Sequence, residues 1–328
     1  MHRAVRPLRA RYIGYTKGTM NHGDEALIWI IRELLAPEIE VLTEGDEYDL
    51  ALLGGGTLIN QSPWLIDAFE AALNKAKGGM TLGTGVGDPA FWGDHFERWS
   101  ALLNRCDFVG VRGPRSVQLL HQRQIEKAIC VGDPYLWLRS PVERDPIPRR
   151  LGVNLGGTNN SLWGGGKDQE YLEYAAGELS ALRRKDWSFI WLSVWEQDLP
   201  LLERVRARVD SLSPGVIDVR TQPLEAYAAL AGCDVFLGEK LHASAMAAVA
   251  GIPFIALEYQ PKVVDFAASI EMADCCLSTA IREPGALTDK IEELHGRRDV
   301  AQMKMIEARD RLRLELIEFT RAIEKRFC

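Results

Sequence analysis

Short apolar runs alternate with amphipathic stretches along almost the whole chain. Apolar runs bounded by glycine, proline or polar residues are typical of buried strands, and apolar residues spaced three or four apart are typical of helices. Their alternation predicts parallel sheets whose strands are joined by crossover helices. The runs that predict strands are Arg11–Tyr15, Leu50–Leu53, Met80–Leu82, Phe108–Val111, Ala128–Val131, Leu151–Leu155, Phe189–Val194, Val216–Val219, Asp234–Leu237 and Phe254–Leu257.

A proline-rich, charged stretch divides this series in two. Residues Ser140–Arg150 read SPVERDPIPRR, a composition typical of a linker. The sequence therefore predicts an α/β protein of two doubly wound, Rossmann-like domains that face each other across a cleft. The first covers residues 1–142, and the second covers residues 150–328 and ends in one charged amphipathic helix. In such folds ligands bind at the carboxyl ends of the strands.

The overall charge and the cysteines narrow the function classes. A net charge of −7 argues against a nucleic-acid partner, since nonspecific binding to nucleic acid needs a basic surface. The six cysteines show no C-x-x-C spacing, as expected of thiols in a reducing compartment. The basic N-terminus lacks the apolar core of a signal peptide, and no apolar run is long enough to cross a bilayer. We expect a cytoplasmic protein. Peripheral contact with the inner face of the membrane is compatible with this expectation.

Glycine clusters recur where predicted strands end. They are Gly54–Gly56, Gly83-x-Gly85-x-Gly87 and Gly156-Gly157. Such turns expose backbone N–H groups to anions, although tight turns also need glycine for conformational reasons alone. None fits the dinucleotide fingerprint, and there is no Walker-A loop. NAD and ATP are therefore not expected as ligands, and no spacing of residues suggests a metal site.

A lysine and a histidine stand at the predicted start of a helix, where cations are normally unfavourable. Residues Gly238–Pro253 read GEKLHASAMAAVAGIP, in which small apolar residues predict a closely packed helix that Gly251 and Pro253 terminate. A helix N-terminus carries about half a positive charge. Lys240 and His242 would therefore be unfavourable there unless an anion neutralised them, and helix N–H groups with two cations suit a phosphate or carboxylate. The alternative for His242 is a purely structural hydrogen bond.

Two further polar segments lie beside the glycine turns. In Asn21–Glu25, Asp24 is placed either to cap the following helix or to bind a hydroxyl group of a ligand. Arg112 follows a predicted strand directly, where it would meet an anion or remain solvated. Aromatic residues near predicted strand ends, Trp137, Trp163 and Trp195, would either stack on sugar rings or pack in the core.

These motifs, taken in order, make the sequence resemble polysaccharide pyruvyltransferases. The resemblance covers most of the chain. The residues that carry it are Asn21-x-Gly23-Asp24-x-Ala26-Leu27, Asp49–Leu58, Gly83-x-Gly85-x-Gly87, Arg112-x-x-Arg115-Ser116, Gly132-Asp133-Pro134, Lys240–Ala243, Ala250–Pro253 and Tyr259-x-x-Lys262. It implies a fold similar to the two-domain glycosyltransferase-B arrangement. It also implies transfer of pyruvate from phosphoenolpyruvate to two hydroxyls of a sugar, as a cyclic ketal, in exopolysaccharide or cell-wall glycan biosynthesis.

The resemblance assigns roles to the candidate residues. Arg112, Lys240 and the N–H groups of Leu241–Ala243 would hold phosphoenolpyruvate, and His242 would be the general acid, its pKa raised by the two ligand anions. An oligosaccharide or lipid-linked saccharide would be the acceptor, with no cofactor beyond the donor substrate. The residues expected at the acceptor or lining the cleft are Asn21, Asp24, Gly55, Gly56, Gly85, Trp163, Glu258 and Tyr259.

Two other functions fit the same residues. A glycosyltransferase of the same fold that uses a nucleotide sugar would hold a diphosphate equally well at a helix N-terminus with Lys240 and His242. A catalytically silent protein that binds a sugar or an anion is the other alternative, in which loss of His242 would hardly matter.

Overall fold

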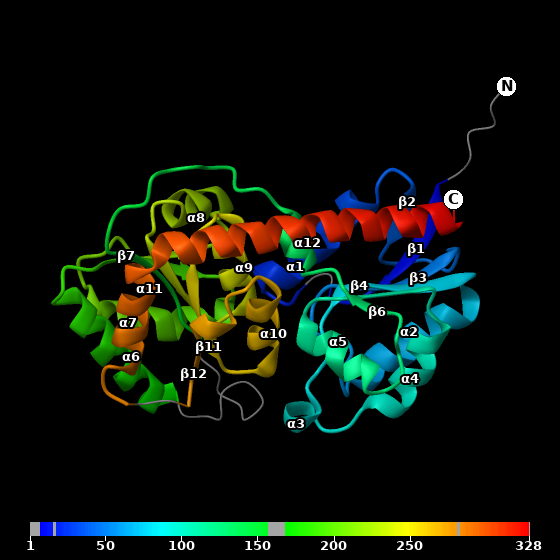
Figure 1. Cartoon of the computed structure of the whole chain (residues 1–328), viewed down its shortest axis with the longest axis horizontal. Helices are drawn as coiled ribbons and strands as arrows, with labels where there is room; N and C mark the ends of the chain where they lie inside the picture. Colours follow the sequence, from blue (N-terminus) through cyan, green and yellow to red (C-terminus); the bar gives the residue numbers. More distant parts are fainter. Residues whose placement is uncertain (1–6, 16–17, 157–167, 281–282, 328) are drawn as a thin grey trace. The chain divides into compact units, whose positions relative to one another are not determined.

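The chain forms two compact units. The computed structural model describes residues 7–15, 18–156, 168–280 and 283–327 (Figure 1). Unit 1 contains the described residues within Met1–Thr19, Asp24–Trp137 and Arg311–Cys328, and unit 2 those within Met20–Gly23 and Leu138–Asp310. The change from one unit to the other at Leu138 lies just before the predicted linker. Each unit is an α/β structure with its own parallel sheet.

Unit 1 is built on a parallel sheet that has six strands among the described residues, in the order β2-β1-β3-β4-β5-β6. The strands are β1 (Leu8–Ile13), β2 (Ile39–Leu42), β3 (Leu50–Gly54), β4 (Gly78–Thr84), β5 (Phe108–Val111) and β6 (Ala128–Cys130). The helical segments that join and follow them are α1 (His22–Leu35), α2 (Pro63–Lys75), α3 (Pro89–Trp92), α4 (Phe96–Arg105), α5 (Pro114–His121) and η1 (Pro134–Trp137).

Continuous apolar runs place the middle strands of this sheet in the core. Every residue of β3 is buried, as expected for a parallel strand covered on both faces. On one side of the sheet, Phe69 of α2 packs against Trp99 of α4, with ring centroids 6.0 Å apart. The Trp99 indole N–H donates to the carbonyl of Asn60 at 2.7 Å, so its one polar atom is satisfied within the core.

Unit 2 repeats this architecture with a different strand order, β12-β11-β10-β7-β8-β9, again with six strands among the described residues. The strands are β7 (Arg150–Asn154), β8 (Ser188–Ser193), β9 (Val216–Asp218), β10 (Val235–Gly238), β11 (Phe254–Glu258) and β12 (Cys276–Ser278). The helical segments are α6 (Asp168–Arg183), η2 (Glu196–Asp198), α7 (Leu199–Val209), α8 (Pro223–Leu230), α9 (Leu241–Val249), α10 (Pro261–Ser269), η3 (Ala273–Cys275) and α11 (Ala286–Gly296).

Each sheet has one place where its strand order reverses. In unit 1, β1 lies between β2 and β3, and in unit 2, β7 lies between β8 and β10. Crossovers leave in opposite directions from these strands, and a crevice opens outside the carboxyl ends of the two neighbours. The switch point of unit 1 therefore lies at the ends of β1 and β3, and that of unit 2 at the ends of β7 and β10.

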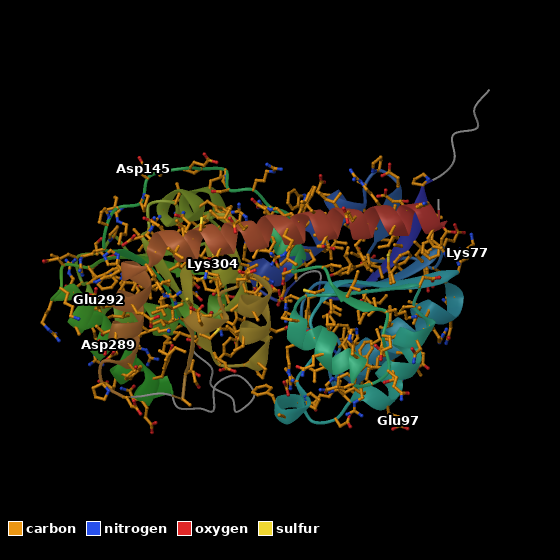
Figure 2. All side chains as sticks on the ribbon, viewed as in Figure 1. Lys77, Glu97, Asp145, Asp289, Glu292 and Lys304 are labelled. Carbon is orange, nitrogen blue, oxygen red and sulfur yellow. The ribbon has the colours of Figure 1, made fainter. Side chains whose placement is uncertain are left out.

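Ion pairs lie at the edge of the unit 2 sheet where the strands start, opposite the switch point. The carboxylate of Asp234, just before β10, forms an ion pair with the Arg298 side chain at 3.0 Å and lies 2.6 Å from the imidazole of His295. Nearby, Glu292 of α11, labelled in Figure 2, pairs with Arg149 at 3.1 Å. These ion pairs hold α11 against the edge of the sheet at which the strands start. They lie away from the carboxyl ends of the strands.

The C-terminal helix α12 (Arg298–Phe327) corrects the predicted domain boundary. It is a single amphipathic helix, as expected, but only its part up to Asp310 belongs to unit 2. From Arg311 onward it packs on unit 1, where Phe319 meets Phe108 edge-on at 5.7 Å between ring centroids. A Cβ on Gly110 would come within 2.8 Å of the same Phe319 ring, so the small residue in β5 makes room for the helix.

Two edge strands, β2 and β12, were not among the predicted strands. Both are short: β2 reads IEVL and β12 reads CLS. Their alternating or half-buried residues give a weaker signal than the continuous runs of central strands, because an edge strand is covered less completely. None of the helices among the described residues is both long and apolar enough to cross a membrane.

Candidate active site at the end of strand β10

The sequence Gly238–Pro253 folds as the end of a strand and a fully buried helix. Lys240 immediately precedes α9, and Leu241 and His242 form its first turn. The small residues that follow allow α9 to be buried along its whole length, and Gly251 ends the segment with a φ of 75°, which favours glycine. Lys240 and His242 are 4% and 7% exposed, so both side chains lie in a largely water-excluded place.

The charge of Lys240 is balanced by a carboxylate of the protein itself. Its Nζ lies 3.4 Å from Oδ1 of Asp198, which is completely buried. The rings of Trp195 and Tyr259 flank the ammonium group, each with its centroid 4.9 Å from Nζ. A desolvated ammonium over aromatic faces is stabilised by the ring quadrupoles. The sequence pattern predicted that a ligand alone would neutralise Lys240, whereas Asp198 supplies part of the negative charge.

Hydrogen bonds between side chains and backbone groups connect the start of α9 to the end of β7 and the residues just after it. Oδ1 of Asn154, at the end of β7, accepts from the N–H of Lys240 at 3.0 Å, and its Nδ2 donates to Leu192 of β8. Glu239 accepts from the N–H of Gly156 at 2.8 Å. These contacts span the switch point between β7 and β10, and they fix Lys240 within the crevice where this fold binds ligands.

The segment Met20–Gly23 docks on unit 2 beside His242. The N–H of His22 donates to Val194 at 2.8 Å, and the N–H of Glu196 donates to Met20 at 3.2 Å. Oδ1 of Asn21 accepts from the N–H of Gly23 at 3.0 Å, which closes a tight turn. A Cβ built on Gly23 would overlap the imidazole ring of His242. The motif Asn21-x-Gly23 therefore packs against the candidate general acid.

The start of α1 corrects one expectation. The helix begins at His22, so Asp24 lies inside the first turn, and Asn21 occupies the position just before the helix.

At the start of α9, the N–H of Ala243 donates to the carbonyl of Lys240 at 3.0 Å. Of the three N–H groups expected to face an anion, that of Ala243 is thus engaged within the helix.

Among the other residues predicted for the site, Tyr259 contacts Lys240 as described, and Glu258 is the last residue of β11. The backbone carbonyl of Glu258 accepts from the N–H of Thr279 at 3.0 Å, and Glu258 is partly exposed. Trp163 and Gly157 lie outside the described residues. Within the ranges that the structure describes, no cluster of three or more His, Cys, Asp and Glu residues could hold a metal ion.

Arg112 lies in unit 1, where its side chain contacts other residues of the protein. It is 1% exposed and donates to the carbonyl of Gly56 at 3.4 Å and to Oγ1 of Thr57 at 3.0 Å. Its guanidinium lies 3.8 Å from the carboxylate of Asp133, whose pKa is raised by burial although Arg112 opposes this. Gly85 allows the close approach of the guanidinium, where a Cβ would clash. Arg112 thus ties the glycine turns together, and its contact with a substrate stays a prediction.

Three of the residues predicted for the acceptor meet at the switch point of unit 1. Asp24, Gly55 and Gly56 lie close together in a cluster packed too tightly to admit a water molecule, which also contains Tyr12, Tyr15, Leu27, Gly54 and Leu58. Gly55 and Gly56 have φ values of 67° and 61°, a left-handed turn that turns the chain away from β3. This cluster lies at the ends of β1 and β3.

Several residues of the two sites gave no individual signal in the sequence. Asp198 and Asn154 were not predicted. Asn154 is the last residue of β7, and Asp198 lies in η2, five residues after the end of β8. An acidic or amide residue at the end of such a strand, or in the turn that follows it, is a signal that could have found them, once the strand order was known. The strand order is set by long-range pairing, which the local sequence pattern does not specify.

The family model for polysaccharide pyruvyl transferase matches residues 6–261 of the chain. No curated protein matches it. Among solved structures, the fold is similar to that of a glycosyltransferase from Rickettsia africae, 10% identical with a TM-score of 0.57, covering 98% of this chain and 99% of that chain. A putative UDP-N-acetylglucosamine 2-epimerase from Listeria monocytogenes is 12% identical with a TM-score of 0.54, covering 92% and 91%. These likenesses concern the fold alone, and they confirm the predicted α/β class with two Rossmann-like domains of the glycosyltransferase-B type.

Proposed function

Because the chain belongs to the polysaccharide pyruvyl transferase family, we propose that it transfers pyruvate from phosphoenolpyruvate to two hydroxyl groups of a sugar. The product is a cyclic ketal on an oligosaccharide or a lipid-linked saccharide, made during exopolysaccharide or cell-wall glycan biosynthesis. The donor supplies its own activated group, so no further cofactor is required by the chemistry.

The observation that carries the proposal is the burial of Lys240 and His242 together at the start of α9. Within the described residues, no acceptor reaches Nζ of Lys240 with the geometry of a hydrogen bond, although Asp198 forms an ion pair with it. An ammonium group has three N–H donors. A phosphate or carboxylate oxygen of phosphoenolpyruvate would accept from them in a site where charge-assisted hydrogen bonds are strong.

In the proposed reaction His242 acts first as an acid. Its proton adds to the methylene carbon of phosphoenolpyruvate, which becomes a methyl group and leaves C2 electrophilic. One sugar hydroxyl forms a bond to C2 and returns its proton to His242. The second hydroxyl then forms its bond to C2 while the bond from C2 to the phosphate oxygen breaks, and its proton leaves with the phosphate. One phosphoenolpyruvate and one diol thus give one ketal and one inorganic phosphate.

The packing of Gly23 against His242 supports this role. General acid catalysis needs the acid held within hydrogen-bond reach of the atom it protonates. A buried ring with Gly23 packed against it has few orientations available. Lys240 and the N–H of Leu241 would orient the donor, while His242 supplies the proton.

The test is incubation of the protein with phosphoenolpyruvate and an oligosaccharide acceptor. Release of phosphate together with the mass of one pyruvate ketal on the saccharide is the expected result. His242→Ala should lower kcat by about 10²–10⁴-fold, the usual contribution of general acid catalysis, with an unchanged circular dichroism spectrum. Release of a nucleoside diphosphate from a sugar nucleotide, without turnover of phosphoenolpyruvate, would instead identify a glycosyltransferase. Near-normal turnover by the His242 variant would exclude its role as the acid.

A further inference from the structure

Asp198 pairs with Lys240 by charge and does not occupy its hydrogen-bond donors. Oδ1 of Asp198 lies 3.4 Å from Nζ of Lys240, within the distance of an ion pair. Among the described residues, no acceptor meets this ammonium group with the geometry of a hydrogen bond. An ammonium group carries three N–H donors. The pair therefore gives Lys240 a counter-charge and leaves its donors available to an anion.

The aromatic neighbours of Lys240 also leave these donors available. The ring centroids of Trp195 and Tyr259 each lie 4.9 Å from Nζ. The face of an aromatic ring attracts a cation through its quadrupole, but it carries no full negative charge. Asp198 supplies the full charge that the two rings lack.

Burial makes this counter-charge necessary before a ligand arrives. Lys240 is almost fully buried, and Asp198 is completely buried. Removing an ammonium group from water is costly unless a group of opposite charge lies close to it. Without Asp198, the site would therefore not hold a cation at this position. Because Asp198 is itself inaccessible, it can act on a ligand only through Lys240.

We propose that Asp198 is a positioning residue for the donor: it holds the ammonium group of Lys240 at the start of α9, where the phosphate or carboxylate of the donor accepts from it. The inference rests on the proposed function in taking phosphoenolpyruvate as that donor. Loss of Asp198 should weaken donor binding, although it removes a negative charge from the surroundings of an anion. The effect should vanish when Lys240 is absent.

Gly156 lies close to both members of the pair. A Cβ built on Gly156 would come within 2.6 Å of Nζ of Lys240 and 3.0 Å of Oδ1 of Asp198. The ammonium group is the end of a flexible side chain, so it would move before the backbone does. Gly156→Ala should therefore separate the two charges without removing either of them.

Donor affinity tests the proposal directly. In isothermal titration calorimetry, Asp198→Asn should bind phosphoenolpyruvate about tenfold more weakly than the unmodified protein, the lower end of what a hydrogen bond to a charged group contributes. Gly156→Ala should weaken the binding as well. In steady-state kinetics, Asp198→Asn should raise the donor KM and leave kcat nearly unchanged, because the lost interaction is made by the bound substrate and the transition state alike.

Removal of Lys240 distinguishes a positioning role from a merely structural one. Lys240→Met should bind phosphoenolpyruvate weakly, and the further change Asp198→Asn should not weaken the binding again. A structural role of Asp198 would instead give the same loss of affinity with and without Lys240. That result, or tighter donor binding by Asp198→Asn, would overturn the inference.

Asp234 provides the matched control. It is a buried carboxylate of the same unit, forms an ion pair with Arg298 at 3.0 Å and lies just before β10, at the other end of that strand from Lys240. Asp234→Asn should bind phosphoenolpyruvate like the unmodified protein. Equal losses of affinity in Asp234→Asn and Asp198→Asn would contradict a specific role for Asp198.

Inorganic phosphate separates this inference from the proposed reaction, because phosphorus NMR titration reads its binding without any transfer. If Asp198→Asn weakens the binding of phosphate while phosphoenolpyruvate is never turned over, the role of Asp198 stands and the proposed reaction fails. If pyruvate is transferred and Asp198→Asn has the donor affinity of the unmodified protein, the reaction stands and this role is wrong. Binding of neither anion to the unmodified protein would overturn both.

Discussion

Gly23 packs directly against the imidazole ring of His242, so closely that a Cβ on Gly23 would overlap the ring. The N–H of His22 and the carbonyl of Met20 fix this turn to the residues that follow β8, which leaves Gly23 little freedom to withdraw. A methyl group at this position must therefore displace either the turn or His242.

Gly23→Ala is expected to lower kcat by about 10²-fold, since a displacement of about 1 Å at a reacting group can cost that much. Gly177→Ala is the matched control: Gly177 lies within α6, and a Cβ there meets nothing within 4 Å. The control should keep its activity and gain a little stability, because alanine favours a helix over glycine. Steady-state kinetics of both variants checks this, and equal activities would contradict the packing argument.

The buried pair Asp198 and Lys240 should show strong coupling in a double-mutant cycle. Asp198→Asn leaves the Lys240 ammonium without its buried counter-charge, and Lys240→Met does the same to Asp198. Each change should lower the free energy of unfolding by about 3 kcal/mol, the usual cost of breaking a buried ion pair from one side. The double variant should lose much less than the sum of the two. Urea unfolding measures all three, and simple additivity would mean that the two charges do not interact.

Asp133 should give a stability that depends on pH in the direction set by its burial. Because its pKa is raised in the folded protein, the folded state binds the proton more tightly than the unfolded chain does. Its contribution is therefore present below the ordinary pKa and is lost as the pH rises through the folded pKa. The unfolding free energy of the unmodified protein, minus that of Asp133→Asn, should fall as the pH is raised.

Asp94 offers the opposite slope as a control. The N–H of Phe96 and the side chain of Arg123 hold its pKa below the ordinary value. Its contribution is present above that value and is lost as the pH falls, so the same difference for Asp94→Asn should rise with pH. Urea titrations at a series of pH values compare the two. Slopes of the same sign would contradict the assignment for one of them.

The buried cysteines should be unreactive in the native protein. Burial raises the pKa of Cys106 and of Cys233 to about 12, so almost no thiolate exists at pH 8. Iodoacetamide at that pH should leave both unmodified in the folded state and modify both in urea, as peptide mass spectrometry can read. Rapid labelling of Cys233 without denaturant would show that β10 opens readily, because this thiol lies at its start.

Local sequence patterns were sufficient for the central strands and for α9. The continuous apolar run of β3 and the small residues after His242 each specify one structure. The division of α12 was beyond such patterns, since its apolar stripe is continuous and only the packing of Phe319 on Phe108 assigns its second part to unit 1. Edge strands such as β12 are short and half-covered, and they carry little periodic signal.

The same limit of local sequence patterns applies to the candidate site. Lys240 and His242 were found because they violate a local electrostatic preference at a helix start. Asp198 supplies the counter-charge of Lys240 from a segment about forty residues earlier in the chain. Its position depends on the pairing of β8 with β7. Contacts between segments far apart in sequence leave no mark on the local pattern, so the counter-charge could not be predicted with the charge.

The docking of Met20–Gly23 has a consequence for how the halves of this protein can be exchanged. Residues 138–310 alone lack the turn that confines His242, because that turn is encoded near the N-terminus. A chimaera that joins this second half to the first half of a relative inherits a foreign turn at the imidazole. Replacement of the first half therefore preserves the site only if the incoming N-terminal segment again presents glycine opposite His242.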